Sequence, residues 1–330
     1  MKEFIMRVIL FLLCLVFSLS TVMGSESHQS VRPDQHAPIS VMCDHVHVNG
    51  EFMWSYRYMQ MTMLGVLNGV DSVSYETYNS ETSYMKYLDS MNMTMHMLGV
   101  MYAQSEKLTW MLMLPYINND MTVKAKMGGA LSSMTSTGIG DLKFGPLYSL
   151  INQNNVKSHI NLTFSLPTGA IDVKDSNMTV GYPMQLGSGT FDLKPSLTIV
   201  RFFHDSSIGF QFNATLRTGQ NNQGYRLGHS LNNKLWIAKT FGNYSFSSSL
   251  IYQSIGSISG QHSGIMSVMN AALDASNSGQ EQVTSTFGMN VAFDNGYRLA
   301  LEYLLPVVQS VTGYQMDDTG SFVFGIQKAY

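Results

Sequence analysis

The chain lacks three features that would each point to a common class of protein. Asp, Glu, Lys and Arg make up only 12% of its 330 residues, about half of the ~25% that soluble domains carry, so a cytosolic enzyme is not expected. The formal net charge of -3 provides no excess of basic residues for a phosphate backbone, which disfavours nucleic acid as a partner. Beyond the N-terminal residues, no apolar run reaches the ~20 residues that a membrane-spanning helix needs.

The N-terminal residues follow the pattern of a secretory signal peptide. Lys2 and Arg7 precede an apolar run over residues 8–17, and Gly24 supplies a small residue at the expected cleavage site. We predict a signal peptide over residues 1–24, cleaved near Gly24. Because the other cysteine lies inside this peptide, cleavage leaves Cys43 alone and the mature chain without an intrachain disulfide.

Aromatic residues, in contrast, are abundant and alternate with smaller or polar ones. In residues 51–64, every second position from Phe52 to Tyr58 is aromatic. Six other segments show the same alternation of apolar and polar positions: 107–116, 141–148, 159–166, 210–217, 244–252 and 297–305. This period of two predicts strands with one apolar face and one polar face.

Weaker segments raise the number of predicted strands to about 12. They are 90–103, 187–203, 226–240, 283–294 and 322–330. Long and short connections alternate between the strands, as they do when all the short turns lie at the periplasmic end. The sequence therefore predicts an all-β fold, a transmembrane antiparallel up-and-down β-barrel with no soluble domain. Residues 25–50 would be a periplasmic N-terminal segment and residues 51–330 the barrel in a bacterial outer membrane.

Several short sequence motifs resemble those of one known family. They are Asp44-His45, GEFM at 50–53, SYRYM at 55–59, GIGDL at 138–142, LPTG at 166–169 and LGSGT at 186–190. In this order and spacing they resemble the outer-membrane transporters grouped with the meta-pathway of phenol degradation, distant relations of the channels for hydrophobic compounds. The resemblance implies transport without naming a substrate.

The resemblance also implies the partners of the barrel. These are the lipid bilayer, lipopolysaccharide and a small-molecule solute. The last predicted strand carries Phe322, Phe324, Ile326 and Tyr330 at alternating positions, the kind of pattern that barrel-assembly machinery recognises in its substrates.

Methionines are concentrated between Met42 and Met134 and often alternate. Alternation places each set on one face, which we expect to line the lumen. The predicted lumen-lining residues are Arg57, Met59, Met61, Met93, Met95, Met97, Met111, Met113, Asp141, Lys143, Arg217, Arg298 and Glu302. Methionines in the lumen would form a flexible apolar lining for hydrophobic solutes or would bind Cu(I) or Ag(I). If they lie on the outer face instead, they contact lipid.

Histidines suggest a metal site less specifically. His45 and His47 share one side of an extended segment, as a pair of ligands would. The candidate metal set is His45, His47, Met91, Met93, Met95 and His96, with Cu(I) or Ag(I) as the only cofactor considered. The alternatives are a solvated tail or partial plug for the N-terminal segment, and an interior polar residue for His96.

The predicted function is an outer-membrane channel or transporter for small hydrophobic or aromatic solutes. A Cu(I)- or Ag(I)-handling barrel with a methionine-rich lumen is the first alternative, and a structural or adhesive barrel the second. The predicted inner face is mostly basic, which is compatible with anionic solutes. No catalytic residues are predicted, because His204 and Ser206 have the even spacing of a Ser-His pair only at a turn. The protein is therefore not expected to be an enzyme.

Overall fold

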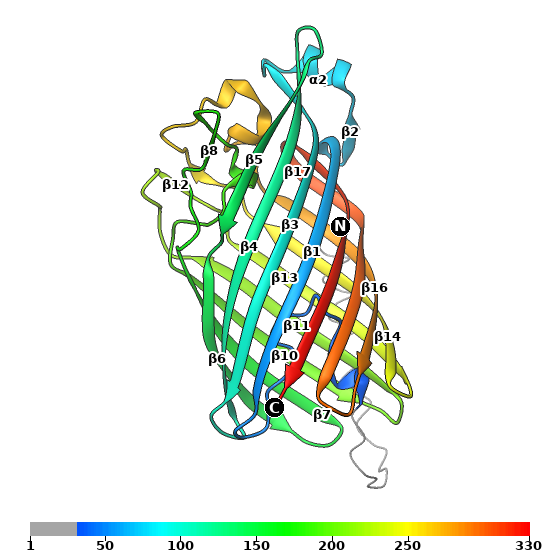
Figure 1. The fold of residues 1–330 in the computed structure, drawn as a ribbon. Coiled ribbons are helices and arrows are strands. Elements are labelled where there is room, and N and C mark those ends of the chain that lie inside the picture. The colour runs from blue at the N-terminus through cyan, green and yellow to red at the C-terminus, as the bar shows by residue number, and fades with distance from the viewer. Residues whose placement is uncertain (1–31) are drawn as a thin grey trace.

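The wall of the protein is an antiparallel sheet that closes on itself (Figure 1). The computed structural model describes residues 32–330, so the predicted signal peptide and its cleavage site lie outside the described residues. Hydrogen-bonded neighbours follow the order of the chain: β1 (Phe52–Gly69), β3 (Lys86–Ala103), β4 (Leu108–Ala125), β6 (Leu142–Asn152), β7 (Val156–Leu166), β10 (Asp192–Phe202), β11 (Ser206–Arg217), β13 (Ser230–Phe241), β14 (Tyr244–Ile255), β16 (Gln280–Ala292) and β17 (Tyr297–Ala329). The last element pairs with β1 and closes the ring.

The 33-residue element β17 crosses the wall twice. Residues 298–311 pair with β16, residues 311–329 pair with β1, and both pairings are antiparallel. The chain reverses near Gly313, whose φ of 70° suits glycine. Ten elements cross once and β17 crosses twice, which gives the twelve passes expected from the alternation of the sequence.

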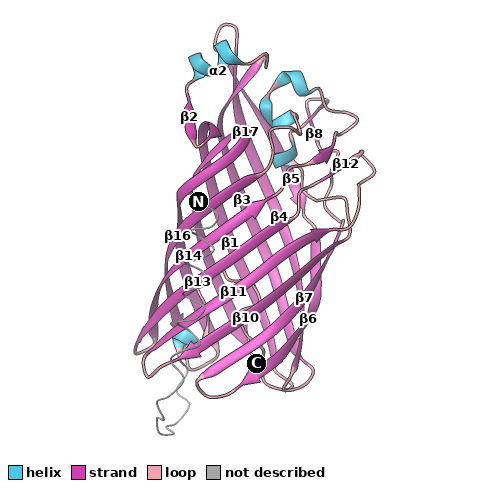
Figure 2. Cartoon of the chain, turned by 180° about the vertical axis from the view of Figure 1, so that it is seen from behind, coloured by secondary structure: helices cyan, strands magenta, loops and turns pink. Residues whose placement is uncertain are grey.

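Short connections lie at one end of the barrel and long ones at the other, except that the tight reversal near Gly313 lies at the end of the long connections. The short ones are 104–107, 153–155, 203–205, 242–243 and 293–296, at the end where the C-terminus lies (Figure 1). The long ones carry β2 (Asp71–Val73), α2 (Tyr75–Glu81), β5 (Leu131–Ile139), β8 (Lys174–Asp175), β9 (Met178–Thr179), η2 (Tyr182–Met184), β12 (Tyr225–Arg226), β15 (Ser259–Gly260), η3 (Ser267–Met269) and η4 (Ala271–Leu273) (Figure 2). Outer-membrane barrels keep their short turns in the periplasm, so we call these ends the periplasmic end and the outer end.

None of the helices in residues 32–330 is long and apolar enough to cross a membrane.

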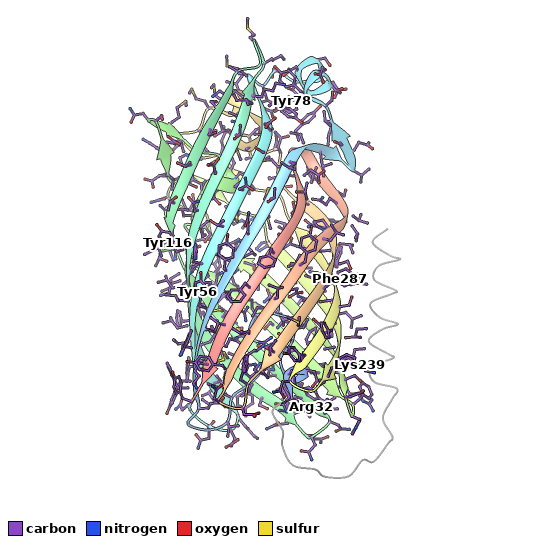
Figure 3. All side chains as sticks on the ribbon, turned by 45° about the vertical axis from the view of Figure 1, so that its right-hand side comes forward. Arg32, Tyr56, Tyr78, Tyr116, Lys239 and Phe287 are labelled. Atoms are coloured by element: carbon purple, nitrogen blue, oxygen red, sulfur yellow. The ribbon has the colours of Figure 1, made fainter. Side chains whose placement is uncertain are left out.

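The outer surface carries an apolar band that ends in an aromatic row. Tyr56, Tyr116 and Phe287 point away from the wall (Figure 3). The register places Tyr58, His96 and Tyr116 side by side on β1, β3 and β4. Beyond this row the outward residues of β4 become polar: Asn118, Asp120, Thr122 and Lys124. The row is therefore the aromatic girdle at the outer boundary of the membrane.

The apolar band predicts the cost of a misplaced charge. Leu112→Arg, between Leu108 and Tyr116, is expected to destabilise the barrel by ~2–4 kcal/mol, because it places a charge near the middle of the lipid-facing surface. Asn118→Arg is the matched control on the same face of the same strand, and beyond the girdle it should cost only ~0–1 kcal/mol. Denaturant unfolding of the two variants in liposomes measures both costs, and equal costs would contradict this boundary.

The long connections pack together over the outer end of the barrel. Ser74 caps α2 by accepting a hydrogen bond from the backbone N–H of Thr77, and Tyr78 of this helix is completely buried. Its cluster includes residues from six connections or strand ends: Val66, Val73, Leu88, Met91, Met121, Val180, Met184, Ala271 and Ala272. The outer end is therefore covered by a packed apolar layer.

Candidate functional site

Residues 32–50 enter the periplasmic half of the barrel, with residues 48–50 exposed at its end, and we call this segment the plug. Figure 1 shows this segment in dark blue behind the strands. Wall side chains bind its backbone: Gln211 Nε2 donates to the Met42 carbonyl at 2.8 Å, and His159 Nε2 lies 2.8 Å from the Cys43 carbonyl. The plug has almost no regular structure, so its carbonyls need such partners when they are buried. The segment is thus held in the lumen and is not a solvated tail.

Apolar side chains of the plug fill gaps in the polar interior. Ile39 is 1% exposed and packs against Ala300 and Val323 of β17. Gly325 leaves the space for it, since a Cβ at that position would lie 2.7 Å from Ile39 Cδ1. Val41 packs against the buried Trp236 of β13. Shape as well as hydrogen bonding therefore fixes the position of the plug.

A buried carboxylate ties the plug to the wall. Glu302 of β17 has no exposed surface. Its Oε2 accepts hydrogen bonds from the backbone N–H of Ser40 at 2.8 Å and from the Ser40 hydroxyl at 2.7 Å. Its Oε1 lies 3.2 Å from Lys234 Nζ and also accepts from Thr286. One negative charge is thus shared between the wall and the tip of the plug.

The alternating methionines occupy the inner face of β1, β3 and β4. The register pairs Met59 with Met95, Met61 with Met93, Met63 with Met91 and Met101 with Met111. Because the aromatic girdle lies on the opposite face, these methionines do not contact lipid. Met59, Met61, Met93 and Met95 keep some exposed surface although they point inward. We call these four residues the methionine wall, which borders open space in the lumen.

The other predicted lumen residues, apart from Asp141 in the connection before β6, also belong to the inner face, but several are covered. Met97 and Met111 are buried, and Met111 Sδ lies 3.2 Å from Cys43 Sγ of the plug. Burial raises the pKa of Cys43 to about 12, so its thiol stays protonated. By strand register, Arg57, Met113, Lys143, Arg217, Arg298 and Glu302 face inward as well. The oxygens of Asp141 accept backbone hydrogen bonds from Gly169 and Ser188.

A basic wall lies beside the methionine-bearing strands. The register pairs Met113 of β4 with Lys143 of β6. No carboxylate in residues 32–330 lies within salt-bridge distance of Lys143, whereas Arg217 is paired with Asp192. Lys194 Nζ is 3.3 Å from Thr215 Oγ1. The lumen thus offers an apolar, sulfur-rich side and an adjoining cationic side.

The predicted metal set is not one site. His96 is on the outer face, where Tyr56 hydroxyl lies 2.8 Å from its Nδ1. The prediction that His96 is a metal ligand or an interior polar residue was therefore wrong. His96 has an even position on β3 and faces away from the odd-numbered methionines. Met91 is buried in the outer-end cluster. His45 and His47 line a cavity at the periplasmic end, so the histidines and Met91 lie at opposite ends.

A closed barrel with an apolar outer band, an aromatic girdle and a partly open polar interior defines the class of outer-membrane β-barrel channels. The chain belongs to the family described as "Putative MetA-pathway of phenol degradation", whose model matches residues 101–304. The family resemblance predicted from the sequence is therefore confirmed.

Solved structures share the barrel fold at low sequence identity. The COG4313 outer membrane channel from Pseudomonas putida F1 superposes with a TM-score of 0.66 and 12% identity, covering 88% of this chain and 100% of that chain. The transport unit of the autotransporter AIDA-I from Escherichia coli gives a TM-score of 0.50 and 9% identity over 88% of this chain and 94% of that chain. Comparison with curated protein sequences finds no match.

Proposed function

We propose that the protein is an outer-membrane channel for small hydrophobic or aromatic solutes. The observation that carries this proposal is the methionine wall, four inward-facing thioether side chains that keep accessible surface in the lumen. Thioethers make favourable contacts with aromatic rings, worth ~0.3–1.5 kcal/mol each, and adapt to different shapes. Membership of a family named after phenol degradation supports an aromatic solute.

The adjoining basic wall refines the class of solute. Lys143 is a cation without a salt bridge among residues 32–330 and pairs in register with Met113. An aromatic acid that passes along the methionine-bearing strands would bring its carboxylate to Lys143. An aromatic amine of the same size would bring its positive charge toward this lysine. The channel is therefore proposed to favour aromatic acids over aromatic amines.

The proposed setting is the bacterial outer membrane, with lipid around the band and lipopolysaccharide around the outer strands. We propose that assembly machinery recognises the second pass of β17, whose outer face carries Phe322, Phe324 and Ile326. Transport of this kind needs no catalytic group, since the barrel supplies a path and no bond is made or broken.

Uptake into liposomes tests the role of the methionine wall. Replacing Met59, Met61, Met93 and Met95 together by glutamine keeps side-chain length but makes the wall polar. Benzoate uptake should fall by about tenfold, which corresponds to ~1.4 kcal/mol of lost aromatic contact. Replacement of the same four residues by leucine keeps the wall apolar and should retain most of the uptake.

Two further measurements make the test specific. Met127, an exposed outer-loop residue, provides a matched control, and Met127→Gln should transport like the unchanged protein. Benzylamine should enter more slowly than benzoate. Equal uptake by the glutamine and leucine variants would argue against a solute path along the methionine wall.

A further inference from the structure

Three histidines of the plug surround one cavity at the periplasmic end. His36, His45 and His47 line a cavity of about 200 Å³, together with Glu51 and Arg298. The rings of His36 and His45 have centroids 4.6 Å apart, and those of His45 and His47 are 4.4 Å apart. Neighbouring imidazoles at this spacing inside a barrel are not needed for packing, since apolar side chains would fill the same volume without a desolvation cost.

The donor atoms are close enough to share one ion. One ligand atom each from His36, Asp44 and His45 lie within 4.8 Å of one another. Asp44 Oδ2 is 3.8 Å from His36 Nδ1, and Asp44 Oδ1 is 3.0 Å from His45 Nδ1. A tetrahedral ion with bonds of ~2.1 Å holds its ligand atoms ~3.4 Å apart, so small side-chain rotations suffice.

His47 supplies an independent indication of a ligand. Its side chain is 5% exposed, and its Nδ1 lies 3.0 Å from Glu51 Oε1. Its Nε2 is buried and has no hydrogen-bond partner in residues 32–330. A carboxylate on one ring nitrogen fixes the tautomer and leaves the other nitrogen free to bind a metal, the usual arrangement around metal-ligating histidines.

The charges around the cavity suit a divalent cation. Two carboxylates accompany the histidines: Asp44 Oδ1 lies 3.0 Å from His45 Nδ1, and Glu51 Oε1 lies 3.0 Å from His47 Nδ1. Arg298 stays 4.0 Å from Asp44, because its guanidinium donates to Asn290, Gln327 and the Ala37 carbonyl. Asp44 Oδ2 accepts a hydrogen bond from the Ala37 backbone N–H at 3.0 Å, and Oδ1 lies nearest to His45. Each oxygen keeps a lone pair for a cation.

We propose that His36, Asp44, His45 and His47 bind one divalent transition metal ion of the zinc type, with Glu51 orienting His47. Imidazole and carboxylate donors favour Zn²⁺, Cu²⁺ or Ni²⁺, whereas Cu(I) and Ag(I) favour thioether or thiolate ligands. All four ligands belong to the plug, so the ion cross-links the segment 36–47 and holds it in its folded shape within the lumen. The site is separate from the methionine wall and does not depend on the solute of the channel.

Equilibrium dialysis of the full-length protein in detergent, after treatment with a chelator, tests the site. One equivalent of Zn²⁺ should bind per chain. The variants His45→Gln and His47→Gln should each weaken binding by at least about tenfold, and Glu51→Gln should weaken it by about 10–100-fold as a group that orients a ligand. His204→Gln is the matched control, because His204 is exposed on a turn at the same end, and it should leave binding unchanged.

The unchanged protein supplies a second measurement that does not depend on variants folding. Co²⁺ bound in place of Zn²⁺ should give the intense visible absorption of a four-coordinate ion with nitrogen and oxygen ligands. Metal loading should also protect the plug from an added protease. Absence of stoichiometric Zn²⁺ binding, a six-coordinate Co²⁺ spectrum, or binding that only His204→Gln removes would overturn the proposal.

Discussion

Deleting residues 33–49 is expected to raise the ion conductance of the barrel on the order of tenfold, because this segment fills the periplasmic half of the lumen. The wall of twelve passes encloses more space than its own side chains occupy. In the intact protein, Ile39 and Val41 use this space and have almost no exposed surface. Without them, the polar residues that now bind the plug would face water.

Recordings in planar lipid bilayers measure this change for single channels. Deletion of residues 127–128, which are exposed in the turn between β4 and β5, shortens the chain at the other end and should leave the conductance unchanged. If the conductance of the deletion variant stays within twofold of that of the intact barrel, the lumen is closed elsewhere, at the outer-end cluster around Tyr78.

The strands of the barrel wall were predictable because each strand shows its own alternation of apolar and polar residues over a short stretch of sequence. Each membrane-facing strand alternates apolar and polar residues, and the contrast is large for Phe52 to Tyr58 and for Leu108 to Tyr116. The strands were predicted too short where they leave the membrane. Residues 117–125 of β4 have polar side chains on their outer face, so the alternation loses contrast although the backbone pairing continues.

The plug was not predictable from local pattern, because its contacts connect distant parts of the chain. Ser40 and Glu302 are 262 residues apart, and no periodicity in residues 32–50 indicates which wall residues they meet. His36 was missed as a partner of His45 for the same reason. His96 is different, since the parity of its position already placed it opposite the methionines.

The ion pair between Lys234 and Glu302 is expected to have the largest effect on stability. Glu302→Leu removes the charge that balances a buried lysine and the acceptor for Ser40. Leaving one charge of a buried pair without its partner typically costs ~3–5 kcal/mol. The same change should loosen the plug and increase conductance fluctuations, because the wall loses its tie to the plug tip.

A double-mutant cycle separates the pair from the other contacts of Glu302. Lys234→Leu should destabilise the barrel by a similar amount, ~3–5 kcal/mol, since it leaves the carboxylate unpaired. The double variant Lys234→Leu/Glu302→Leu removes both charges and should be clearly more stable than either single variant. Denaturant unfolding in detergent gives the three free energies. If the free-energy losses of the two single variants add up in the double variant, the two charges do not stabilise each other. The link between wall and plug would then consist only of the hydrogen bonds between Glu302 and Ser40.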